Sequence, residues 1–126
     1  MRPVVYDTGV LIAADRSERR TWAEHRVRLD TGTIPLVPAP VVAQASRSPK
    51  QAQMRRFLRG CEVVAFDERA AHTAGSLLGK TGTNDVVDAS VAVLSIQYGA
   101  DVVSADAADI QRLLSTGHTK TSIIDV

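Results

Sequence analysis

The stretch NDVVDASVAVLSIQYGADVVS, residues 84–104, decides the fold class of this chain. Residues 84–98 favour one long helix that is apolar on nearly every side, and Gly99 is a typical helix stop. Residues 101–104 (DVVS) then form an apolar run of strand length. A helix without a polar face is buried, so we expect it to cover a sheet that contains the strand after it.

The same alternation of strands and helices extends outward in both directions. The predicted strands cover residues 4–6, 34–37, 61–66, 101–104 and 122–124, and the predicted helices cover 8–14, 19–29, 41–45, 51–58, 67–78, 84–98 and 107–114. The near-continuous apolar runs VVY, CEVVAF and DVV are typical of parallel strands buried on both faces. The sequence therefore predicts an α/β fold, a three-layer α/β/α arrangement around a mainly parallel central sheet of four or five strands.

Length and composition are those of an ordinary globular domain. The 126 residues suit one domain over 1–126, and 44% apolar with 23% charged residues argues against disorder. No apolar run is long enough to span a membrane and the N-terminus has no signal-peptide layout, so we expect a cytoplasmic protein without membrane association. The single cysteine, Cys61, excludes an intrachain disulfide and a thiolate metal cluster, and we expect it to be buried and inert.

Charge is unevenly distributed, although the net charge is only +1. Residues 16–59 carry ten basic side chains against three acidic ones, whereas the rest of the chain carries five basic against eleven acidic ones. A basic segment beside an acidic remainder suits a protein that binds a polyanion and holds cations in a carboxylate pocket. The alternative is that these charges only solvate exposed helix faces.

Acidic residues recur where predicted strands end. Asp7 follows the strand over 4–6, Asp106 follows the strand over 101–104, and Asp85 and Asp88 share one face of the first turn of the long helix. Ligands of open parallel sheets bind outside the carboxyl ends of the strands. If these carboxylates converge, their repulsion must be neutralised, and oxygen ligands favour Mg²⁺ or Mn²⁺.

Each acid also has a purely structural interpretation. Asp7 and Asp106 stand where helix N-caps are expected, and Asp106 with Asp109 resembles a capping box. Asp85 and Asp88 would favour the positive end of the helix dipole. Carboxylates that serve only as caps at two strand ends and one helix start need not lie close together. Their convergence would therefore favour the metal-site interpretation over the structural one.

Four segments together resemble a known family. They are VVYDTGVLIA (4–13), VVAQ (41–44), DVVDASVAVLS (85–95) and VVSAD (102–106). In this order and spacing they resemble the PIN domain, and specifically the VapC-type ribonuclease toxins of toxin–antitoxin pairs. The resemblance covers essentially the whole chain.

The resemblance implies a set of site residues. It carries the family's first, third and fourth acids onto Asp7, Asp88 and Asp106, as catalytic residues and metal ligands. The supporting positions are Ser104, the hydroxyl partner in the motif that ends at Asp106, and the accessory acids Asp85 and Asp109.

One position departs from the family pattern. The family's second acid is usually a glutamate on the short helix after the second strand, and Gln44 stands there in this chain. An amide carbonyl can coordinate a hard cation but carries no charge. We therefore expect weaker metal binding, with Asp85 or Asp109 able to compensate.

The resemblance further implies an activity and partners. It implies a Mg²⁺- or Mn²⁺-dependent endoribonuclease that hydrolyses phosphodiester bonds of RNA such as tRNA or rRNA and acts as a toxin. A VapB-like antitoxin and a homodimer are the implied protein partners. Arginines within 16–59 would then contact the RNA backbone.

Two alternative functions remain open at the level of sequence. A receiver-type signalling domain would use Asp67 as its phospho-acceptor, with Ser104 and Lys120 beside it. It requires paired acids after the first strand, where this chain has only Asp7, and it gives no role to the acids of the long helix. The other alternative is an RNA-binding module that has lost most of its catalytic power.

The remaining histidines and large aromatic residues are interpreted as structural. His25, His72 and His118 have no metal-ligand spacing and are expected at the surface. Trp22 and Phe57 are expected in the core, or on a surface that meets a partner.

Overall fold

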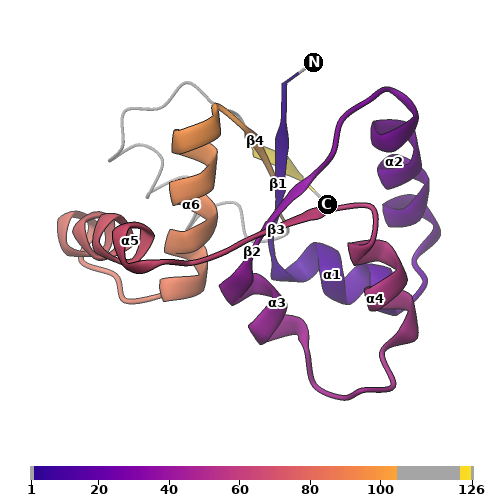
Figure 1. The fold of residues 1–126 in the computed structure, drawn as a ribbon, viewed down its shortest axis with the longest axis horizontal. Helices are drawn as coiled ribbons and strands as arrows, with labels where there is room; N and C mark the ends of the chain where they lie inside the picture. Colours follow the sequence, from indigo (N-terminus) through magenta and orange to yellow (C-terminus); the bar gives the residue numbers. More distant parts are fainter. Residues whose placement is uncertain (1, 105–122, 126) are drawn as a thin grey trace.

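The protein folds around a five-stranded sheet in which every neighbouring pair is parallel. The structure, a computed structural model, describes residues 2–104 and 123–125 (Figure 1). The strands are β1 (Val4–Tyr6), β2 (Leu36–Pro38), β3 (Glu62–Val64), β4 (Asp101–Ser104) and β5 (Ile123–Asp125), in the order β3-β2-β1-β4-β5. The prediction of a parallel α/β fold with four or five strands is confirmed.

Helices cover both faces of this sheet. They are α1 (Thr8–Asp15), α2 (Arg19–Asp30), α3 (Ala39–Ala45), α4 (Ala52–Leu58), α5 (Glu68–Thr81) and α6 (Val86–Tyr98). Figure 1 shows α5 and α6 on one side of the sheet and α1, α2 and α4 on the other. In the described residues no helix is long and apolar enough to cross a membrane. The predicted helix over 107–114 lies outside the described residues.

The core is built on β1 and α6. Val5 and Tyr6 of β1 are fully buried, and the middle of α6 is buried against β1 and β2, as its apolar sequence predicts. On the opposite side Phe57 is fully buried, which confirms its assignment to the core, and Trp22 packs partly buried against it. The central strand is therefore rigidly held, and so is the residue that follows it.

The strand β3 is more exposed than its apolar sequence predicts. It spans only Glu62–Val64, and Val63 is 47% exposed. The run CEVVAF is wrongly interpreted as a strand buried on both faces, because β3 lies at the sheet edge and pairs only with β2. Strand order, which the run itself does not reveal, decides this burial.

Several helix boundaries also differ from the prediction, among them the end of α5 and the start of α6. Helix α5 continues through Gly79 to Thr81 and ends at Gly82, which has a left-handed φ of 69°. Gly79 is tolerated inside the helix because an internal glycine costs only about 1 kcal/mol. Helix α6 is capped by Asp85, not by Asn84 at the predicted start of the helix.

The expectation that all three histidines lie at the surface is wrong for His25. This ring is 3% exposed and stacks on Phe57 with ring centroids 3.9 Å apart. Its Nδ1 and the Tyr6 hydroxyl are hydrogen-bonded at 2.9 Å, so the buried polar ring has a partner. His72 is exposed as predicted, and His118 lies outside the described residues.

Candidate active site

Asp7 is fixed at the carboxyl end of β1 by contacts on several sides. It is 6% exposed, and its backbone N–H donates to the Val103 carbonyl at 3.3 Å, continuing the pairing of β1 with β4. Its Oδ1 accepts from the Val10 N–H at 3.3 Å and so caps α1, and its Oδ2 accepts from the Ser104 hydroxyl. A carboxylate oxygen has two lone pairs, so each oxygen can accept from more than one partner.

Ser104 reaches Asp7 because of the strand register. The parallel pairing of Tyr6 with Val103 places the residues after them side by side at the same sheet edge. Ser104 is fully buried, and its Oγ donates to a residue that lies 97 positions away in the sequence. The hydroxyl thereby fixes the orientation of the Asp7 carboxylate.

Gln44 is brought to the same end of the molecule by α3. This helix packs against both α1 and α6. The Gln44 Oε1 accepts a hydrogen bond of 2.6 Å from the hydroxyl of Thr8, the residue directly after Asp7. The partner of the amide is thus the sequence neighbour of the buried Asp7 carboxylate. The Gln44 side chain itself is exposed on α3.

The two acids at the start of α6 differ in burial. Asp85 is exposed, and its Oδ1 accepts from the Asp88 N–H at 3.0 Å, so it serves as the N-cap. Asp88 is partly buried, and its Oδ2 is inaccessible to solvent. The Asp85 side chain is therefore engaged at the surface in capping α6, whereas part of the Asp88 carboxylate is buried.

The start of α6 lies at the same end of the sheet as Asp7. Helix α6 leads through Gly99 directly into β4 and runs antiparallel to the strands, so its first turn returns to their carboxyl ends. Figure 1 shows this end of α6 beside α3, at the lower end of the molecule where β1 enters α1. Asp88 thus shares one end of the sheet with Asp7 and Gln44, whereas Asp106 and Asp109 lie outside the described residues.

The oxygen atoms at this end of the sheet, within the residues that the structure describes, are of the type that binds a hard cation. They are the Asp7 and Asp88 carboxylates and the Gln44 carbonyl, and oxygen ligands are those that Mg²⁺ and Mn²⁺ prefer. Within residues 2–104 and 123–125, no three His, Cys, Asp or Glu side chains gather closely enough to hold a metal ion. A full set of ligands therefore requires a further acid, and Asp106 is the first acid after β4 in the sequence.

The sheet order argues against a receiver-type domain. The doubly wound order of receivers is 2-1-3-4-5, in which the third strand lies beside the first. Here β3 is at the edge and β2 separates it from β1, so Asp67 after β3 lies two strands away from Asp7. Asp67 instead caps α5, with its Oδ1 accepting from the Ala70 N–H at 2.9 Å.

Behind Asp7, a buried polar cluster connects β1 to α2. The Tyr6 hydroxyl is hydrogen-bonded to His25 Nδ1 and accepts from Arg28 Nη1 at 3.2 Å. Burial, reinforced by the Arg28 charge, lowers the pKa of His25 to about 4, so the ring is neutral and can accept. Burial raises the pKa of Tyr6 to about 12. No sequence motif identifies this cluster, because its members come from two elements.

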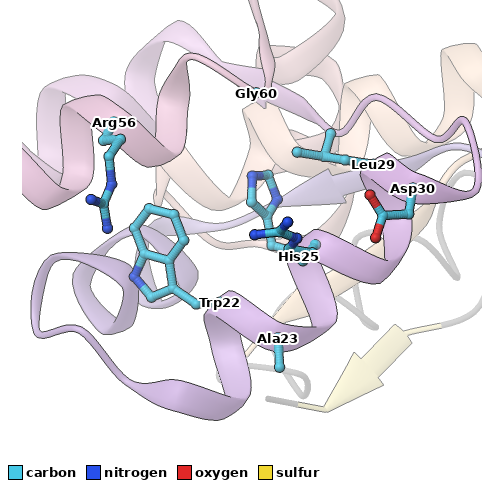
Figure 2. Close-up of a pocket in the computed structure, with 8 residues that line it drawn as sticks. Trp22, Ala23, His25, Leu29, Asp30, Arg56 and Gly60 are labelled. Carbon is cyan, nitrogen blue, oxygen red and sulfur yellow. The ribbon is translucent and has the colours of Figure 1, made fainter.

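Two cavities lie away from the candidate site. One, of about 690 Å³, opens beside α2, where Figure 2 shows Trp22 and Arg56 at one end, His25 in the middle and Leu29 with Asp30 at the other end. A second cavity of about 630 Å³ lies beside β3, α5 and α6. Asp7, Gln44 and Asp88 line neither cavity.

Comparison with known proteins identifies a family and a set of similar folds. The PIN domain family matches residues 4–113, and no curated protein matches the chain. The crystal structure of VapBC2 from Rickettsia felis bound to a DNA fragment from their promoter matches with a TM-score of 0.73 and 16% identity, covering 98% of each chain. That of DNA-bound VapBC from Salmonella typhimurium matches with a TM-score of 0.71 and 20% identity, covering 99% of this chain and 98% of the other. FitAcB from Neisseria gonorrhoeae matches with a TM-score of 0.62 and 16% identity over 96% of each chain. At these identities the likeness shows a shared fold.

Proposed function

Because the chain belongs to the PIN domain family, a family of nucleases, we propose that it is a divalent-metal-dependent endoribonuclease. The observation that supports this most is the placement of Asp7, a buried carboxylate fixed by Ser104 and by the start of α1 at the carboxyl end of the central strand. Ligands of open parallel sheets bind at this edge.

The proposed roles follow from where the side chains lie. Asp7, Asp88 and Asp106 would hold Mg²⁺ or Mn²⁺, which when bound lowers the pKa of an attacking water and stabilises the leaving oxygen of the phosphodiester. Ser104 orients the Asp7 carboxylate, and the Asp85 cap fixes the first turn of α6 and hence Asp88. The accessory acid Asp109 is proposed to support the same site.

The basic segment is proposed to bind the RNA backbone. Residues 16–59 run from the end of α1 to the end of α4, and they include α2 and α4 on one side of the sheet (Figure 1). Not every arginine is available, since Arg28 donates to Tyr6 and Arg56 lies over the Trp22 ring at 4.8 Å. The exposed Arg19, Arg26 and Arg59 are better placed to meet phosphates.

The biological role is proposed from the relatives. Two of the matching structures are described as VapBC pairs on DNA, so we propose that this single domain is a cytoplasmic toxin of the VapC type, a homodimer inhibited by a VapB-like antitoxin. RNA of the tRNA or rRNA kind is the proposed substrate.

The experiment that tests the activity compares RNA cleavage with Mg²⁺ or Mn²⁺ and with EDTA. We expect cleavage only with the metal, and we expect Asp7→Asn and Asp88→Asn to abolish it. Asp67→Asn is the matched control, because Asp67 is also an N-cap aspartate in a connection from a strand to a helix, but that strand, β3, lies at the edge of the sheet. Cleavage that persists in EDTA, or an Asp7→Asn protein as active as wild type, would contradict the proposal.

A further inference from the structure

The Thr8–Gln44 hydrogen bond fixes which end of the Gln44 amide faces outward. The donor and acceptor oxygens are 2.6 Å apart. The Thr8 hydroxyl donates to the carbonyl oxygen Oε1 of the amide, and the amide nitrogen Nε2 takes no part in this contact.

The amide nitrogen of Gln44 is consequently left for another partner. Within the part of the chain that the structure describes, Nε2 has no hydrogen-bond acceptor, and Gln44 is exposed on α3. Its partner Thr8 directly follows Asp7, so the Gln44 amide lies at the end of the sheet that carries Asp7, where α3 packs against α6. A ligand at this end would thus meet a neutral donor next to carboxylates.

A neutral donor at this position suits an anionic ligand. A phosphodiester carries a negative charge and acceptor oxygens, and carboxylates alone repel it. An N–H group directed at a non-bridging oxygen supplies a hydrogen bond to a charged acceptor, which is stronger than a bond between neutral groups. Glutamate at the same position would have no donor and would add repulsion.

We propose that Gln44 is a substrate-binding residue that donates from Nε2 to a phosphate oxygen of the RNA, and that Thr8 is the positioning residue that orients it. This inference rests on the proposed ribonuclease function. It assigns Gln44 to the substrate and not to the metal, which its carbonyl could otherwise coordinate. Part of the affinity for RNA is then independent of divalent cations.

The test measures binding of a fluorescently labelled RNA stem–loop by anisotropy in EDTA, where cleavage does not interfere. Gln44→Met keeps the length of the side chain and removes the donor, and we expect it to weaken binding about tenfold. We expect Gln44→Glu to weaken binding at least as much, and Thr8→Val to weaken it about threefold, because the amide loses its orientation but not its donor. Gln97→Glu is the matched control, since Gln97 is exposed near the far end of α6, and it should bind as wild type does.

A second readout separates a substrate contact from a metal ligand. In a titration with Mn²⁺ alone, Gln44→Met should bind as wild type does, whereas Gln44→Glu should bind more tightly because it adds a charge. The inference is overturned if Gln44→Met binds RNA as tightly as wild type, or if it loses Mn²⁺ affinity. If wild type cleaves RNA and only these variant effects are absent, the inference alone fails. If wild type neither binds nor cleaves RNA, the proposed function fails with it.

Discussion

At the scale of single residues, Asp7 combines a structural and a proposed chemical role. Its Oδ1 caps α1, and its Oδ2 receives the Ser104 hydroxyl. Asparagine keeps an oxygen that can accept from the Val10 N–H but removes the charge. Alanine removes both the charge and the cap. The two substitutions therefore separate folding from metal chemistry.

The first prediction follows from this difference. We expect Asp7→Asn to melt within a few degrees of wild type, whereas Asp7→Ala should lose about 1 kcal/mol or more, the usual cost of an N-cap aspartate replaced by alanine. Thermal and urea unfolding of the two variants would measure this. Equal stability of Asp7→Ala and Asp7→Asn would show that the cap does not stabilise α1.

The second prediction concerns the buried His25. Its pKa is about 4 in the folded protein against an ordinary value of 6.5, so between these values the unfolded chain binds a proton that the folded protein does not. Stability is therefore complete above about pH 6.5 and falls as the pH drops towards about 4, by roughly 3 kcal/mol in all. Urea denaturation at a series of pH values measures this slope.

The matched variants for this prediction are His25→Gln and His72→Gln. His25→Gln should be less stable than wild type at neutral pH, and its stability should depend less steeply on pH. His72→Gln, which changes an exposed side chain, should keep the wild-type slope of stability against pH. A wild-type slope that survives His25→Gln would contradict the assignment. Sequence analysis misplaced His25 because its partners, Tyr6 and Phe57, come from other elements and only the fold brings them to it.

At the scale of elements, the Gln51 side chain makes several of the hydrogen bonds that hold the segment between α3 and α4. The Gln51 Oε1 accepts from the backbone N–H of Arg47 at 2.6 Å and of Ser48 at 3.0 Å, and its Nε2 donates to the Ala45 carbonyl at 3.0 Å. Two backbone N–H groups between the helices and the carbonyl of the last residue of α3 are thereby satisfied. This glutamine connects the element that carries Gln44 to the rest of the basic segment.

The third prediction is that Gln51→Ala loosens this segment. We expect the amide protons of Arg47 and Ser48 to exchange with solvent at least several times faster, because their acceptor is lost, and the protein to lose about 1–2 kcal/mol of stability. Hydrogen exchange followed by NMR measures both residues directly. Gln53→Ala, on the neighbouring helix α4, is the control and should leave these two amides unchanged.

The order and type of the elements could largely be predicted from the sequence, and their surroundings could not. The pattern of α6 and β4 predicted both elements, and the acids at strand ends predicted that Asp7 lies at the carboxyl edge of the sheet. The exposure of β3 depends on strand order, which no local pattern contains. The Thr8–Gln44 contact depends on how α3 packs against α1. The sequence alone does not predict it, because the orientation of these side chains is fixed only once the two helices have packed together.

At the scale of the whole molecule, the strand order is what assembles the candidate site. Because β1 lies between β2 and β4, the residues after β1 meet both the end of β4 and the helices that pack over this edge. Asp7 and Ser104, 97 positions apart in the sequence, are joined there by a direct hydrogen bond. The same order removes Asp67 from the centre of the sheet and with it the signalling alternative.

The most direct test of the central claim, that acids far apart in the sequence hold one divalent ion together, is a titration with Mn²⁺ followed by electron paramagnetic resonance. The account predicts that wild type binds Mn²⁺ and that Asp7→Asn, Asp88→Asn and Asp106→Asn each weaken binding by about tenfold or more, since even substitutions behind the ligands cost about that much. Asp67→Asn should bind Mn²⁺ as wild type does. Wild-type affinity in any one of the three variants would contradict the shared site.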